Sequence, residues 1–189
     1  MNRRDALSRV GLLMGATVIG SEFFLSGCKN TDKKGGSELS KDDIAFLDEV
    51  GETIIPTTST PGAKSVGIGA FMNMMVKDCY TDENQKIFTE GIGKLDEASK
   101  KKNSKSFLDS TPEQRTALLN DLDAEQKAYY KSKKKEDPEH YFKLMKQLTL
   151  LGYFTSETGA TKTLRYIETP GHYDGNLPYK KGDKAWATS

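Results

Sequence analysis

The chain of 189 residues carries 28 basic and 27 acidic side chains, so its formal net charge is only +1. A nucleic-acid-binding protein normally gathers a basic excess on one face, and this balance therefore excludes nucleic acid as a partner. The two cysteines, Cys28 and Cys79, are too few for a disulfide framework, and the length suits a single domain. Cys79 lies in an apolar stretch and is expected to be buried.

An export signal is indicated by Arg3 and Arg4, which stand just ahead of an apolar run over residues 10–20. Crossing a bilayer as a helix takes about 20 apolar residues, so this run is too short to be a membrane span. It has the length of a signal-peptide core. Glycines within the run favour the twin-arginine route over the general secretory route.

A lipid anchor is predicted at Cys28, because Leu25-Ser26-Gly27-Cys28 matches the bacterial lipobox. We expect residues 1–27 to be removed and the acylated Cys28 to hold the protein on a membrane. Residues 28–40 are the predicted flexible tether, since residues 29–37 contain no apolar side chain. Asn30 takes the place of the Asp of an inner-membrane retention signal, so we expect attachment to the outer membrane, facing the periplasm.

Residues 41–189 are predicted to form one all-α domain of about five helices. Apolar residues recur three or four positions apart, Ser40, Thr81 and Thr111 stand at helix N-cap positions, and Asp137-Pro138-Glu139 is a further start signal. No segment shows the sustained alternation typical of strands. The predicted helices cover approximately residues 41–54, 68–80, 81–101, 111–129 and 137–154.

The C-terminal tail, residues 155–189, is predicted to be irregular because glycines and prolines interrupt it. The tail is also rich in aromatic residues, which are expected to pack on the helices or on a partner. For Trp186 both alternatives stay open. Glu157 could form an ion pair with Arg165 that holds the tail, and catalysis by Glu157 is the lesser alternative. The residues predicted for a partner interface are Tyr153, Phe154, Glu157, Arg165, Tyr166, Tyr173, Tyr179 and Trp186.

Motifs for cofactors are missing from the sequence, and we predict no cofactor, metal or catalytic residue in this chain. There is no Cys-x-x-Cys-His for haem, and His140 and His172, expected at the surface, lie too far apart in sequence to suggest a metal site. Gly67-Ile68-Gly69 and Gly91-Ile92-Gly93 lack the third glycine of a dinucleotide site. The carboxylate clusters Asp42-Asp43 and Asp48-Glu49-Glu52 could be acid/base pairs, but they are expected on a solvated helix face, because the other face of that helix is apolar.

Several segments together resemble the gluconate 2-dehydrogenase subunit 3 family, the small subunits of membrane-associated, flavin-dependent sugar dehydrogenases. Besides the twin-arginine start, they are Leu47-Asp48-Glu49-Val50-Gly51-Glu52-Thr53-Ile54-Ile55-Pro56-Thr57, Pro61-Gly62-Ala63, Gly152-Tyr153-Phe154-Thr155-Ser156-Glu157-Thr158-Gly159-Ala160 and Pro170-Gly171-His172-Tyr173. The resemblance implies a non-catalytic subunit bound to a flavoprotein of the glucose-methanol-choline type. It implies that FAD belongs to this partner, that the small subunit carries the partner across the membrane, and that a cytochrome subunit passes the electrons on.

Two other functions are compatible with the residues. The chain could be a stand-alone lipoprotein that binds a carbohydrate or another small molecule between its helices and tail. It could also be an enzyme that uses Glu157 and the tail tyrosines. The first alternative predicts stabilisation by a ligand, and the second predicts turnover by the isolated chain that is lost in Glu157→Gln.

Overall fold

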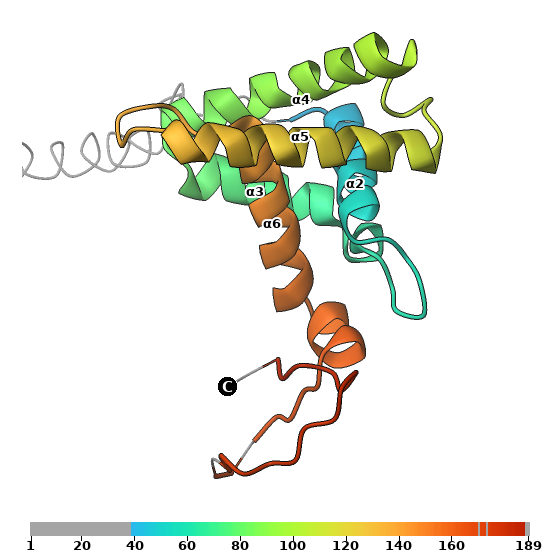
Figure 1. Cartoon of the computed structure of the whole chain (residues 1–189), viewed down its shortest axis with the longest axis vertical. Helices are drawn as coiled ribbons and strands as arrows, with labels where there is room; N and C mark the ends of the chain where they lie inside the picture. The colour runs from blue at the N-terminus through green and yellow to red at the C-terminus, as the bar shows by residue number, and fades with distance from the viewer. Residues whose placement is uncertain (1–38, 170, 173, 188–189) are drawn as a thin grey trace, which may run out of the picture. The chain divides into compact units, whose positions relative to one another are not determined.

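A computed structural model describes residues 39–169, 171–172 and 174–187, and in this part the chain is helical, without a named strand (Figure 1). The predicted all-α fold is confirmed. The export signal, Cys28, nearly all of the predicted tether and Tyr173 lie outside the described residues, and the predicted domain boundaries stay predictions. Within the described part, no helix combines the length and the apolar character needed to cross a membrane.

The helical elements follow one another closely along the chain. A short 3-10 helix, η1, precedes α3, and a π-helical turn, η2, follows α6. The elements are α2 (Lys41–Ile54), η1 (Ala63–Val66), α3 (Ile68–Cys79), α4 (Asp82–Asn103), α5 (Pro112–Ser132), α6 (Tyr141–Thr155) and η2 (Gly159–Thr163).

Side-chain caps explain where α2, α4, α5 and α6 begin. Ser40 and Asp43 form a reciprocal capping box at α2, and the Thr111 and Gln114 side chains do the same at α5. The start predicted at residue 137 is wrong, because α6 begins at Tyr141. The imidazole of His140 caps this helix by accepting a hydrogen bond from the backbone N–H of Phe142 (3.3 Å), so residues 137–139 stay in the preceding loop.

The core is organised around α6, which contacts each of the other four described α-helices. In Figure 1, α6 passes behind α5 and continues downward toward the tail. This central position requires apolar residues on more than one face of the helix. The buried side chains of α6 include Phe142, Leu144, Met145, Leu148 and Tyr153. They pack with those of the other helices, among them Leu47, Ile68, Met72, Phe88 and Leu95.

Gly91 permits the close approach of α4 and α6. A Cβ atom at this position would lie 2.6 Å from the Cβ of Tyr141, whereas a Cβ at Gly93 would meet nothing within 4 Å. In the sequence Gly91-Ile92-Gly93, which resembles part of a dinucleotide motif, helix packing thus requires Gly91 but not Gly93.

Cys79 is exposed, and the prediction that it is buried is wrong. It is the last residue of α3, whose buried positions Ile68, Met72 and Val76 follow one another in steps of four. The next step of four reaches Tyr80, which packs partly buried against the core. The cysteine is therefore left at the surface beside this row.

Substituting the two glycines of α4 separately tests the packing of α4 on α6. Gly91→Ala should lower the free energy of unfolding by about 1–3 kcal/mol, because the new methyl group overlaps Tyr141. Gly93→Ala, the matched control on the same helix, should raise it by about 0.5–1 kcal/mol through the helix propensity of alanine. Urea denaturation followed by circular dichroism measures both. Equal effects at the two positions would contradict this account of the interface.

Candidate functional site

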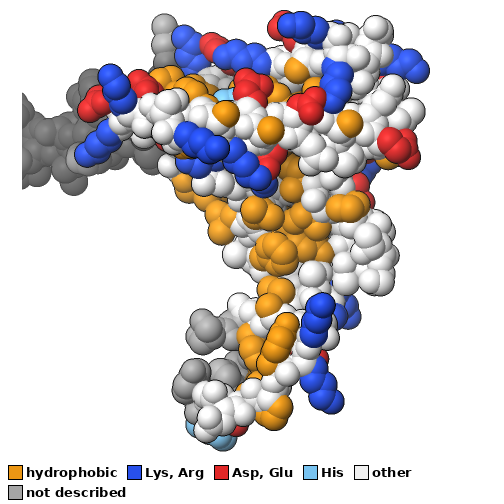
Figure 2. All heavy atoms as spheres, in the orientation of Figure 1, with side chains coloured by type: hydrophobic (Ala, Val, Ile, Leu, Met, Phe, Trp, Pro, Cys, Tyr) orange, Lys and Arg blue, Asp and Glu red, His pale blue; other side chains and the backbone are white. Residues whose placement is uncertain are grey.

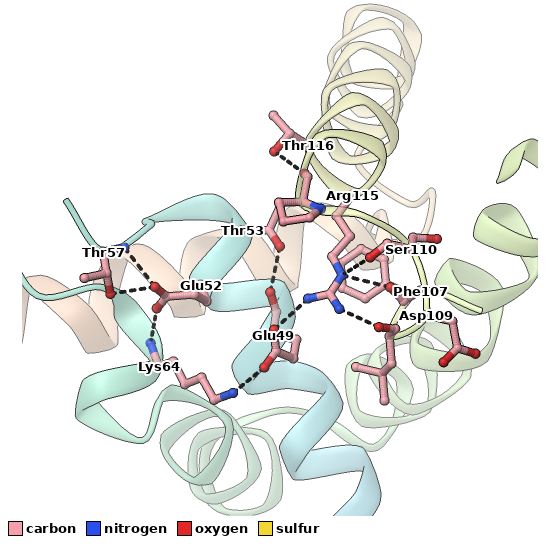
Figure 3. Close-up of polar contacts among 12 residues, drawn as sticks. Glu49, Glu52, Thr53, Thr57, Lys64, Phe107, Asp109, Ser110, Arg115 and Thr116 are labelled. Atoms are coloured by element: carbon pink, nitrogen blue, oxygen red, sulfur yellow. Dashed lines mark hydrogen bonds and ion pairs between the residues drawn. The ribbon is translucent and has the colours of Figure 1, made fainter. Parts of the chain in front are cut away.

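A network of charged side chains joins α2 to α5 and to the loop before α5 (Figure 3). Glu49 of α2 accepts a hydrogen bond from Arg115 Nη1 of α5 (2.6 Å) and forms an ion pair with Lys64. The remaining guanidinium donors bind the backbone of the loop: Nε donates to the carbonyls of Phe107 (3.0 Å) and Ser110 (3.1 Å), and Nη2 donates to that of Leu108 (2.5 Å). Arg115 therefore holds this loop against α2.

The carboxylate of Glu52 binds the loop of residues 55–62, which follows α2. It accepts hydrogen bonds from the backbone N–H and hydroxyl of Thr57 (2.8 and 2.7 Å) and from the backbone N–H of Lys64 (3.0 Å). A side chain at Gly62 would overlap this carboxylate. Asp48 similarly accepts from the backbone N–H of Gly69 (2.8 Å).

The prediction that Asp48, Glu49 and Glu52 lie on a solvated face is wrong. All three are half-buried, because the segments after α2 fold back over them and need acceptors for their free N–H groups. The hydrogen bond and charge of Lys64, together with Arg115, lower the pKa of Glu49 although burial opposes the shift. Glu49 therefore stays ionised at neutral pH, which suits a structural ion pair better than proton transfer.

Tyr153 connects the end of α6 to two other segments. Its ring is fully buried, and its hydroxyl donates to the carbonyl of Pro61 (2.5 Å). Since a phenol has one proton, the hydroxyl of Thr163, 2.6 Å away, must donate to the Tyr153 oxygen. A side chain at Gly159 would overlap the Tyr153 carbonyl. The structure thus joins two segments that carry the sequence resemblance, residues 61–63 and 152–160.

The predicted interface residues do not share one environment. Tyr153 is inside the chain, and its assignment to an interface is corrected, because its hydroxyl and ring are used by internal contacts. The predicted ion pair of Glu157 with Arg165 is also wrong. Glu157 is exposed, whereas Arg165 lies near Asp183 (3.8 Å) and over the ring of Trp186 (4.6 Å). Trp186 makes this internal contact and still exposes 41% of its surface.

Large apolar side chains are exposed over the second half of α6 and along the tail. Figure 2 shows hydrophobic side chains gathered in this region. Single exposed apolar residues are normal, whereas a larger exposed apolar patch is typical of a site that binds a protein, a membrane or a ligand. We call it the α6–tail surface; its members are Leu150, Leu151, Phe154, Tyr166, Ile167, Leu177, Tyr179 and Trp186. Four of these residues were not predicted from the sequence as part of an interface, because the prediction relied on the high number of aromatic residues. They are Leu150, Leu151, Ile167 and Leu177.

The two histidines lie apart and have different environments. His140 is not a surface residue as predicted: it is half-buried, it caps α6, and its Nε2 lies 3.6 Å from a carboxylate oxygen of Glu125. His172 is exposed. Among the described residues, no three His, Cys, Asp or Glu side chains are grouped so that they could hold a metal ion.

Glu49→Gln tests whether the network is structural. The substitution leaves Arg115 half-paired and should lower the free energy of unfolding at pH 7 by about 1–3 kcal/mol. Because folding lowers the pKa of Glu49, its contribution is complete above about pH 4.5, the ordinary value of the group. The contribution is lost as the pH falls through the lowered value.

The difference between wild type and Glu49→Gln should therefore shrink between pH 7 and pH 3 in denaturant titrations. Glu97→Gln, at an exposed position of α4, is the matched control and should change stability little at either pH. A Glu49→Gln variant as stable as this control would contradict the role of the ion pair.

Comparison with known proteins identifies the family. Residues 41–171 match the family model described as gluconate 2-dehydrogenase subunit 3. No curated protein and no solved structure matches the chain. The matched range begins at the first residue of α2, includes every described helix and extends into the tail, so it covers more than half of the sequence. The resemblance noted in the sequence is confirmed, and the chain belongs to the gluconate 2-dehydrogenase subunit 3 family.

Proposed function

We propose that this chain is the non-catalytic accessory subunit of a periplasm-facing, FAD-dependent dehydrogenase of gluconate or a sugar. Membership of the family supports association with the other subunits of such a complex. The observation that carries the proposal is the α6–tail surface, which exposes eight large apolar side chains. In this proposal the FAD and the choice of substrate belong to a flavoprotein of the glucose-methanol-choline type, and a cytochrome subunit receives the electrons.

The α6–tail surface has the chemistry of a protein interface. Tyr, Trp and Phe are enriched at the centres of interfaces, where a few buried anchors supply most of the binding free energy. Burial of apolar area contributes about 25 cal/mol per Å². Leu151 and Phe154 are three positions apart on α6 and expose 46% and 39% of their surfaces, so one partner surface can cover both.

Export and anchoring complete the proposal. The twin-arginine route carries folded proteins, and a flavoprotein must fold around its FAD before export. We therefore assign to Arg3 and Arg4 the export of the partner together with this chain, and to Cys28 the attachment of the complex to the outer membrane. The two assignments are separable, because one concerns crossing the inner membrane and the other concerns retention afterwards.

Charged substitutions on α6 test the interface. Leu151→Asp and Phe154→Asp each place a carboxylate in the proposed contact, and each should weaken binding to the flavoprotein about 30-fold or more, which corresponds to about 2 kcal/mol. Purification of the tagged wild-type chain in mild detergent should recover a larger protein with flavin absorbance. Leu108→Asp is the control, since this exposed leucine lies in the loop between α4 and α5, away from the tail (Figure 1). Recovery of the wild-type chain alone would contradict the proposal.

Substitutions near the N-terminus test export and anchoring. The double variant Arg3→Lys, Arg4→Lys should leave flavin-dependent dehydrogenase activity in the cytoplasm, because the partner loses its export signal. Arg9→Lys is the matched control and should export both proteins. Cys28→Ala should export both but release them into the soluble periplasmic fraction. Normal export of the flavoprotein with the double variant would refute the escort role, and membrane retention of Cys28→Ala would refute the anchor.

A further inference from the structure

The tail returns to its own beginning and forms a closed arm. We call residues 164–187 the arm; all of them except Pro170 and Tyr173 are described. The backbone N–H of Arg165 donates to the carbonyl of Ala185 (2.8 Å), and the N–H of Ala187 donates to the carbonyl of Arg165 (2.8 Å). These two bonds form an isolated parallel bridge between Arg165 and Trp186, and they join the two ends of the arm.

The side chain of Arg165 reinforces this closure. Its Nε donates to the carbonyl of Lys184 (2.7 Å), and its guanidinium lies over the indole ring of Trp186, 4.6 Å from the centroid. Its Nη2 is 3.8 Å from the carboxylate of Asp183, which also accepts from the backbone N–H of Lys180 (3.0 Å). The groups of Arg165 are therefore used within the arm. A stacked guanidinium of this kind contributes about 0.5–1 kcal/mol at an exposed site.

Beyond the closure, the described residues of the arm are exposed. Tyr166, Ile167 and Leu177 expose nearly half of their surfaces, and Tyr179 exposes 75%. Lys180 and Lys181 follow Tyr179 directly, and neither is paired with a described carboxylate, since Asp183 is held by Arg165 and by backbone. Apolar and aromatic side chains thus stand beside two available cations.

We propose that the arm is a preformed docking element that enters a groove on the flavoprotein subunit. The groove is apolar where it receives Leu177 and Tyr179, and it is bordered by carboxylates that meet Lys180 and Lys181. Arg165 is a positioning residue: it keeps the arm closed before binding and does not contact the partner. This inference rests on the proposed function and names the segment and the chemistry through which that function is carried out.

The backbone of the arm favours a protein groove over a lipid surface as the occupant. Basic and aromatic residues together can also bind anionic membranes. In its described residues, however, the arm has no helix or sheet beyond the single bridge that closes it. Most of the described backbone N–H and C=O groups therefore lack a regular partner, and burial of unpaired groups in hydrocarbon costs several kcal/mol each. A protein groove can supply hydrogen-bond partners for them. Glu168 and Asp174, which are exposed on the same arm, would also be repelled by anionic lipid.

Closure matters because it lowers the entropy that binding must remove. An open segment of this length samples many conformations, and fixing it on the partner would cost free energy for each ordered residue. The arm pays part of this cost within the subunit itself, through the bridge and the Arg165–Trp186 stack. A variant that opens the arm should therefore bind more weakly although every contact residue is still present.

The test measures the dissociation constant of the full-length subunit for its flavoprotein in detergent. Arg165→Ala should weaken binding on the order of tenfold while the thermal midpoint of the helical body stays unchanged. Arg165→Lys should behave like Arg165→Ala, because lysine keeps the charge but cannot donate from Nε and stack together. Chymotrypsin should cleave the arm of both variants faster than that of wild type in the free subunit. Lys131→Ala, which removes an exposed charge from α5, is the matched control.

Wild-type affinity in Arg165→Lys would overturn the positioning role, since charge alone would then be sufficient. At the residues proposed to contact the groove, Tyr179→Ala should weaken binding at least tenfold, and Lys180→Glu with Lys181→Glu should both weaken binding and flatten its salt dependence. We call these the tip variants. If wild type and tip variants bind the flavoprotein equally, the arm proposal fails and the proposed function stands. If wild type does not bind the flavoprotein, the proposed function itself fails.

A vesicle experiment tests the membrane as the alternative occupant. The proposal is overturned if the arm binds anionic vesicles and the tip variants lose this binding while their affinity for the flavoprotein is unchanged. The arm would then belong to the membrane.

Discussion

A buried phenol must have hydrogen-bond partners, and at Tyr153 this requirement unites three segments of the chain. Its ring fills the end of the core, and its hydroxyl reaches Pro61 in the loop after α2 and Thr163 before the arm. The point where α6 leaves the helical body is thereby set. Because α6 contacts every other described α-helix, the position of its last turn depends on the whole core, and so does the place where the tail begins.

Some polar residues of the chain are more buried, and some apolar residues more exposed, than their types alone would suggest. Carboxylates on α2 are half-buried and are bound by Arg115, Lys64 and backbone N–H groups, so they position loops. Large apolar side chains are exposed instead along α6 and the tail. The exposure of these apolar side chains is unfavourable for a protein that works alone, since the exposed apolar area remains hydrated. It is favourable for a subunit that buries such an area against a partner, and the family is described by name as a subunit of a dehydrogenase.

The positions of the helices could be predicted because their signals are local. Hydroxyl caps at Ser40, Thr81 and Thr111 lie within three residues of the N–H groups that they bind, and apolar spacing follows from helix geometry. The start of α6 was missed because Asp137-Pro138-Glu139 is a strong local signal that the neighbouring contacts override. The hydroxyl of Tyr129 binds the Pro138 carbonyl (2.8 Å), and His140 provides the cap.

By itself, the sequence determined the all-α class, the approximate helices, the aromatic and irregular tail, and the resemblance that the family match confirms. Only the tertiary structure decided which of these residues are buried and which residues they contact. Glu49 and Arg115 meet across 66 positions, Tyr153 and Pro61 across 92, and Arg165 closes on Trp186 and not on the nearer Glu157. Such pairings depend on how helices and loops that are distant in sequence come together in the fold. No local pattern encodes this, because the free energy of each contact is gained only after distant segments have already been brought together.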